Sequence, residues 1–91
     1  GPVGLHNVLH QRIMEECDQD DYLAIMEDEP QPTAWRNTKD VTLSADLESA
    51  TATIVLVIDG QDVEQQWGFE TENGARWRVV DAPGVAECTG A

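Results

Sequence analysis

Between Asp40 and Asp81 the chain alternates apolar and polar residues with a period of two, the pattern of β-strands that bury one face. One stretch replaces the alternation with a run of mostly β-branched side chains, which also favours a strand. We expect four strands, at residues 41–47, 52–58, 63–70 and 76–81. The short connections between them predict one antiparallel meander, in which the strands pair in chain order.

Three turn signals predict the register of these strands. The Asp-Gly pair at 59–60 is typical of a two-residue hairpin and places Leu56 opposite Val63. A three-residue loop at 72–74 and a two-residue turn at 48–49 set the other two registers. All three registers gather the large apolar residues on one face, and a slip of one residue would break this agreement. The other predicted pairs are Ile58–Gln61, Ile54–Gln65, Ala52–Trp67, Phe69–Trp77, Trp67–Val79, Gln65–Asp81, Glu70–Arg76, Ala45–Ala52, Leu43–Ile54 and Val41–Leu56.

Residues 5–28 show helical spacing instead. Apolar side chains recur every four residues, as at Ile13 and Cys17. An acidic run then divides the segment, and Asp20 or Asp21 is expected to cap a second, shorter helix that the following prolines end. The chain is therefore expected to begin with two helices before the sheet.

These elements predict an α+β fold, with the N-terminal helices packed on one face of a four-stranded antiparallel meander sheet. A chain of 91 residues has room for one modest core, so residues 1–91 are expected to form a single domain. We expect Trp77, beside Phe69, to fill much of that core. The expected parts are a flexible start at 1–4 (Gly1-Pro2 resembles a protease scar), helices at 5–28, the sheet at 41–81 and a tail at 82–91.

The charge of the chain is strongly negative, with 18 Asp and Glu against 5 Lys and Arg and a formal net charge of −13. Nucleic acids and anionic membrane surfaces are bound by clustered Lys and Arg, so the composition argues against both as partners. The longest apolar run, from Ala52 to Ile58, is far shorter than a membrane-spanning helix. We therefore expect no direct insertion into a membrane.

Cys17 and Cys88 are the only cysteines and lie near opposite ends of the chain. They form either a disulfide that ties back the tail or two unrelated buried thiols. An even number of cysteines in a small acidic domain favours the disulfide and an extracytoplasmic location, secreted or anchored on the cell-envelope side.

Two stretches resemble the nuclear transport factor 2-like (cystatin-like) superfamily. The segment DQDDYLAIMEDEP at 18–30 is similar to the helical opening of these domains, and 50–61 with 67–82 is similar to their closing strands. The family often ends in Gly-x-Trp-x-Val, and this chain has one extra residue before Trp77. Its members usually have a third helix and another strand where this chain has only residues 30–39. The resemblance implies a cone formed by sheet and helices, and in many actinobacterial members the domain lies outside the membrane as part of a larger protein.

A candidate ligand site follows from the predicted registers. Gln65 and Asp81 would lie opposite each other on the otherwise apolar face, next to Trp67. Trp35, in a connection bounded by prolines, would either cover the open end of the sheet or remain exposed as an anchor for a partner. A mostly apolar cleft with one or two polar groups is the usual small-molecule site, so the pattern is compatible with a small apolar ligand. A domain this short is nevertheless expected to have a filled or very shallow interior.

Other polar clusters are weaker candidates. His6 and His10 have helical metal-ligand spacing, but two histidines near a chain terminus indicate a solvated face more often than a metal site. The acidic runs lack the spacing of a calcium loop. We expect no metal, no cofactor and no catalytic residue, because no nucleophile, base and orienting group occur together.

These features predict a non-catalytic extracytoplasmic binding or interaction module within a larger secreted or membrane-anchored protein. The alternative is a small cone-type enzyme or binder like ketosteroid isomerases and polyketide cyclases, with Asp81 as a base in a pocket. The sequence is also compatible with a protein partner, and with self-association through the face that carries Val55, Val57 and Val80.

Overall fold

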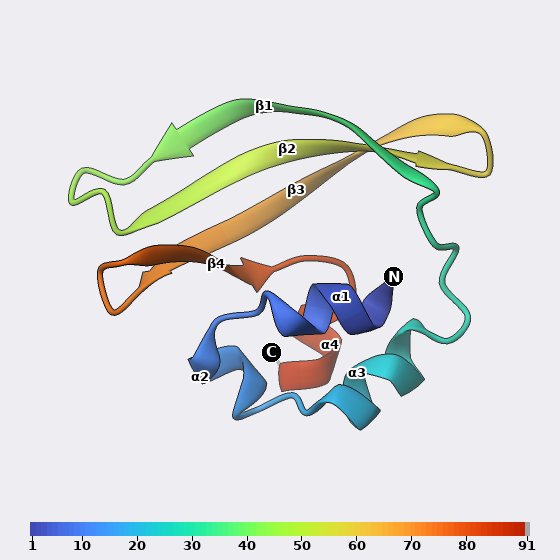
Figure 1. Ribbon diagram of the computed structural model, residues 1–91, viewed down its shortest axis with the longest axis horizontal. Coiled ribbons are helices and arrows are strands. Elements are labelled where there is room, and N and C mark those ends of the chain that lie inside the picture. The colour runs from blue at the N-terminus through green and yellow to red at the C-terminus, as the bar shows by residue number, and fades with distance from the viewer. Residues whose placement is uncertain (91) are drawn as a thin grey trace.

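The expected α+β fold is confirmed. A computed structural model describes residues 1–90, in which short helices lie on one side of an open four-stranded antiparallel sheet of order β1-β2-β3-β4 (Figure 1). The elements are α1 (Pro2–Asn7), α2 (Gln11–Met14), α3 (Gln19–Met26), β1 (Ala34–Leu43), β2 (Ser49–Ile58), β3 (Gln61–Glu72), β4 (Arg76–Asp81) and α4 (Val85–Thr89).

The first expected helix is broken because its middle joins the sheet. The N–H of His10 donates to the carbonyl of Val79 (2.8 Å), and the N–H of Val79 donates to the carbonyl of Val8 (3.0 Å). Leu9 thereby pairs with Val79 as a parallel bridge beside β4, between α1 and α2. This pairing satisfies backbone groups at an edge that would otherwise be open and holds the helices against β4.

The second expected helix begins earlier than predicted. Asp18, rather than Asp20 or Asp21, caps α3, and its carboxylate accepts a hydrogen bond from the N–H of Asp21 at 2.8 Å. The other two acidic residues then fall in the first turn, where their charge complements the helix dipole.

The register between β2 and β3 is the predicted one. Leu56 pairs with Val63, Ile54 with Gln65 and Ala52 with Trp67. The two-residue turn has φ of 52° at Asp59 and 78° at Gly60, as a type I′ turn requires.

The register between β1 and β2 was predicted wrongly, and β1 lies at 34–43 rather than 41–47. The chain reverses through a five-residue loop, 44–48, so Leu43 pairs with Ala50 instead of Ile54. The carboxylate of Asp46 accepts hydrogen bonds from the hydroxyl of Ser44 and from the N–H of Glu48. These bonds stabilise a polar loop that competes with the two-residue turn.

The register between β3 and β4 also differs. Phe69 pairs with Val79 rather than Trp77, and Trp77 pairs with Thr71 near the end of the sheet. Trp77 is 45% exposed, so it is not the core residue that the sequence predicted. The observed register buries Val79 beneath the helices, because the bridge to Leu9 fixes Val79 at that position. The expected Glu70–Arg76 pair is replaced by Glu70–Arg78 across the strands.

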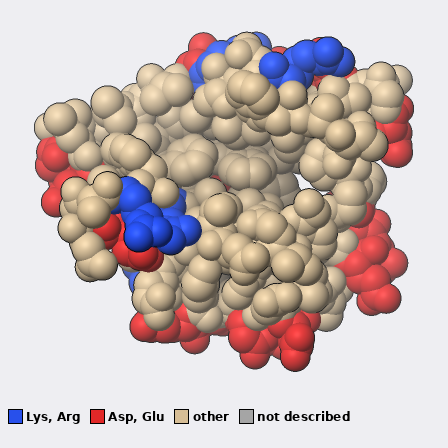
Figure 2. All heavy atoms as spheres, in the orientation of Figure 1, with Lys and Arg blue, Asp and Glu red and all other residues tan. Residues whose placement is uncertain are grey.

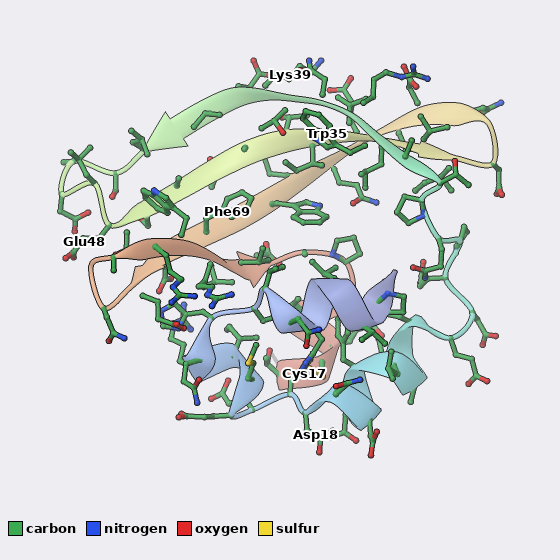
Figure 3. All side chains as sticks on the ribbon, viewed as in Figure 1. Cys17, Asp18, Trp35, Lys39, Glu48 and Phe69 are labelled. Atoms are coloured by element: carbon green, nitrogen blue, oxygen red, sulfur yellow. A yellow bond between two sulfur atoms is a disulfide. The ribbon has the colours of Figure 1, made fainter. Side chains whose placement is uncertain are left out.

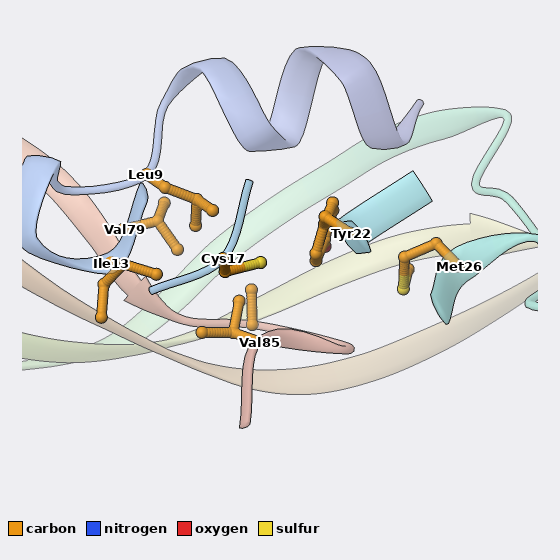
Figure 4. Packing of buried hydrophobic residues seen from close by; sticks show 8 residues of the cluster. Leu9, Ile13, Cys17, Tyr22, Met26, Val79 and Val85 are labelled. Carbon is orange, nitrogen blue, oxygen red and sulfur yellow. The ribbon is translucent and has the colours of Figure 1, made fainter. Parts of the chain in front are cut away.

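Buried residues form two clusters rather than one. The larger joins the helices to β4, and Figure 4 shows its packing. The smaller consists of Ala52, Ile54 and Leu56 on β2, and both clusters contact Trp67 and Phe69. The larger cluster contains Leu9, Ile13, Cys17, Tyr22, Met26, Val79, Ala82 and Val85. Trp67 and Phe69 of β3 therefore link the two clusters.

The expected disulfide is present. Cys17 and Cys88 are bonded with their Cα atoms 5.3 Å apart, and Cys17 lies fully buried in the larger cluster. The bond joins the segment between α2 and α3 to α4, so it ties the tail to the helical layer.

Tyr22 supplies a pH test of the helical core. It is fully buried in the larger cluster, and its hydroxyl donates to the carbonyl of Pro83 at 2.7 Å. Burial raises the pKa of Tyr22 from 10.0 to about 12. Below pH 10 the hydroxyl is neutral in the folded and unfolded chains, and this contribution to stability is fully present. As the pH rises toward 12 the unfolded chain ionises first, so we expect stability to fall between pH 10 and about 12.

Tyr22 is the single tyrosine, so absorbance of the tyrosinate ion reports on it alone. The titration midpoint should lie near pH 12 in the folded protein and near pH 10 in denaturant. Tyr22→Phe should remove this part of the alkaline loss of stability. A folded-state midpoint near pH 10 would contradict the burial of this hydroxyl.

Candidate functional site

An apolar cleft separates the helical layer from the exposed part of the sheet. It has a volume of about 580 Å³, and Figure 2 shows the molecule hollowed between the sheet and the helices. The sheet side is formed by Leu56 and Ile58 of β2 and by Val63, Gln65 and Trp67 of β3. The opposite side is formed by Leu5 and Val8 near α1, Met26 of α3, Pro83 and the linker prolines 30 and 32.

The cleft exists because β4 covers only half of β3. Strand β4 pairs with residues 68–72 of β3, whereas residues 61–67 pair with β2 alone. The helices follow β4, so the β2–β3 hairpin extends past them (Figure 1). The linker at 30–33, with two prolines, then connects α3 to β1 without a helix or strand that could fill the gap.

A glycine lines the cleft on its N-terminal side. This residue is Gly4 of α1. Among residues 1–90, no heavy atom outside its own helix lies within 4 Å of the position that a Cβ on Gly4 would take. A side chain at this position would therefore have free space in front of it.

Gln65 is the polar side chain on the sheet side of the cleft. Its carbonyl oxygen accepts a hydrogen bond from the indole N–H of Trp67 at 2.9 Å, and both residues are half-buried. This bond fixes the orientation of both side chains, and the amide nitrogen of Gln65 remains as a donor. An apolar surface with one oriented amide is suited to binding.

The structure brings two of the four predicted ligand residues together. Gln65 and Trp67 line the cleft. Trp35 does not cover it: this residue lies on β1 and is 63% exposed, and its indole N–H donates to the hydroxyl of Thr38 at 3.0 Å (Figure 3). Asp81 pairs with Gly68 across a bulge instead of facing Gln65, so it lies outside the cleft.

Sequence reasoning missed the walls of the cleft. Leu56 and Val63 were correctly paired on the same face as Gln65, but they were expected to be covered by helices. The signal that could have located the cleft is the difference in length between β3 and β4, with twelve and six residues. The expectation of a filled or shallow interior is wrong, since the helices cover only part of the sheet.

The two histidines have structural roles. His6 is buried, and its Nε2 lies 2.8 Å from the carbonyl oxygen of Cys17. The Nδ1 of His10 accepts from the N–H of Arg12 and caps α2, and its Nε2 lies 3.2 Å from the carbonyl oxygen of Thr71. Within residues 1–90 no group of three or more metal-ligating side chains occurs.

The sheet face opposite the helices is covered by ion pairs that cross β2. Arg36 of β1 binds Asp62 of β3 at 3.2 Å, and Lys39 binds Glu64 at 3.2 Å. Val55 lies between them and is only 8% exposed. This face therefore offers little apolar surface for the self-association considered from the sequence.

No helix among the described residues is long and apolar enough to cross a membrane. No known family model, curated protein or solved structure matches this chain.

Proposed function

We propose that this protein is a non-catalytic binding module that holds a small apolar ligand in the cleft between its helices and its sheet. The observation that carries the proposal is the cleft of about 580 Å³, with apolar walls and the oriented amide of Gln65. Sites for small molecules usually combine these features.

The chemistry of the lining supports binding rather than catalysis. Among the described lining residues, Glu29 has the one titratable side chain, and it lies in the segment after α3 rather than on the sheet. The alternative, a cone-type enzyme, relied on Asp81 as a base beside Gln65, and Asp81 lies outside the cleft. A binding role needs no such base.

An extracytoplasmic location on the cell-envelope side is part of the proposal. The disulfide between Cys17 and Cys88 supports it, because such bonds persist mainly in oxidising compartments. Helices on one face of an antiparallel sheet, with an apolar cleft between the layers, are also consistent with the nuclear transport factor 2-like resemblance of the sequence. That relation remains a fold-level analogy.

Ligand binding can be tested with a neutral apolar fluorophore, N-phenyl-1-naphthylamine, and two variants of Gly4. Gly4→Trp adds a large ring at a residue that lines the cleft, so we expect it to weaken binding by about tenfold or more, which corresponds to about 1.4 kcal/mol. Gly4→Ala changes the helix backbone equally but adds only a methyl group, so we expect its affinity to stay within about twofold of the parent.

The indole N–H resonances give an independent readout. Trp67 lines the cleft, whereas Trp77 is exposed on β4 and does not line it, so the fluorophore should shift the Trp67 signal and leave the Trp77 signal in place. Equal binding by both Gly4 variants, or no saturable shift of Trp67, would contradict the proposed site.

A further inference from the structure

The described side chains that line the cleft carry a negative charge but no positive charge. Among its described residues there is no lysine, arginine or histidine side chain, and Glu29 contributes a carboxylate. Arg12, Arg36, Lys39 and Arg78 are engaged by Glu70, Asp62, Glu64 and Glu72 respectively. Arg76 pairs across the strands with Glu72, at the far end of β4. No basic side chain is therefore placed to receive an anionic ligand.

The net charge of the whole molecule also favours a positively charged ligand. Its formal net charge is −13, which produces a negative potential that extends beyond single contacts and raises the local concentration of cations. A carboxylate entering the cleft would lose water to apolar walls without gaining a cationic partner. A positive head group at the rim, in contrast, would face the carboxylate of Glu29.

Gly1 also lines the cleft, and in a protein prepared with this residue first its α-amino group adds a positive charge. The adjoining helix α1 has only six residues, so its dipole adds little to that charge. Acetylation of the amino group removes the charge without altering any side chain, which allows its effect to be separated from that of Glu29.

We propose that the cleft selects cationic amphiphiles, molecules with an apolar body and a positively charged amine or quaternary ammonium head, and discriminates against fatty-acid-like anions. This inference rests on the proposed binding function and specifies the ligand class. The apolar body lies against Leu56, Ile58 and Val63, and the head group remains near the rim with Glu29. A head group at the rim stays partly hydrated, so the cation does not bear a full desolvation cost.

Three eight-carbon probes that differ only in their head group test this preference: octyltrimethylammonium, 1-octanol and octanoate. Their affinities can be measured from the Trp67 indole resonance of the N-acetylated protein at low ionic strength. We expect the cation to bind most tightly and the alcohol next, with the anion at least about tenfold weaker than the cation. Tetramethylammonium, which has the head group without the chain, should leave the Trp67 signal unchanged.

A matched pair of charge variants locates the effect. Glu29→Gln removes the carboxylate at the rim, and we expect it to weaken octyltrimethylammonium about fivefold while leaving 1-octanol unchanged. Glu27→Gln removes an equal charge from an exposed residue that does not line the cleft, and its effect should be less than about twofold.

The outcomes separate the two proposals. If none of the three probes shifts Trp67, the binding function itself is wrong, and the charge preference falls with it. If octanol binds but octanoate equals or exceeds the cation, the cleft is a binding site and the inferred ligand class is wrong. Equal effects of Glu29→Gln and Glu27→Gln would likewise overturn the assignment of selectivity to the rim.

Discussion

Reduction of the Cys17–Cys88 disulfide should lower the free energy of unfolding by about 4 kcal/mol, one of the two largest effects expected for this protein. The two cysteines are 71 residues apart, so the bond restrains most of the unfolded chain. The total stability of a domain of this size is typically about 5–14 kcal/mol, so the bond supplies a large share of it. Urea unfolding of the oxidised and reduced protein measures the difference directly.

Two features distinguish the effect of the crosslink on stability from the effect of side-chain packing. The reduced protein keeps both sulfur atoms, so the fully buried Cys17 still fills its place in the core. The dependence of the unfolding free energy on urea should also become steeper, since the uncrosslinked chain exposes more surface when it unfolds. A loss below about 1 kcal/mol would show that the unfolded chain is already compact without the bond.

The accuracy of the predicted registers depended on how many alternatives each turn allowed. The Asp59-Gly60 pair has the backbone freedom for one tight turn, and the β2–β3 register followed from it. The loop at 44–48 instead closes through hydrogen bonds among Ser44, Asp46 and Glu48, which spacing alone did not distinguish from a shorter turn. Local sequence therefore predicts a sheet register best where the turn is shortest.

The position of the helices depended on contacts far apart in the chain. Apolar spacing correctly indicated helical residues in the first third, but the bridge between Leu9 and Val79 breaks the helix and fixes β4. Pairing at a sheet edge can override helix propensity over a few residues. This contact explains why Trp77 is exposed and why Val79 is buried in its place.

The candidate site was predicted in part for the same reason. Gln65 and Trp67 were found because they belong to the correctly paired hairpin. Asp81 was misplaced because it belongs to β4, whose register was wrong, and Trp35 lies on β1 as an exposed residue, the second of its two expected positions. The cleft itself arises from the part of β3 that β4 leaves unpaired, a feature of tertiary structure that periodicity does not encode.

Gly84→Ala should destabilise the protein by about 3 kcal/mol, through two separable effects. Gly84 precedes α4 with a φ of 83°, a conformation that costs an alanine about 1 kcal/mol. A Cβ at this position would also lie 2.6 Å from Sδ of Met26 and 3.3 Å from side-chain atoms of Ile25 and Tyr22, well inside contact distance. The Met26 side chain would have to move within the helical core to accommodate the methyl group, and the midpoint of urea unfolding measures the resulting loss.

Gly60→Ala provides the matched control for this effect. Gly60 has nearly the same φ, 78°, but no neighbouring atom among the described residues lies within 4 Å of its Cβ position. This variant should therefore lose only the backbone part, about 1 kcal/mol. The difference between the two variants isolates the contact of α3 with the chain at Gly84. Equal losses would mean that Met26 moves freely into the cleft that it lines, and that this part of the helical core is not tightly packed.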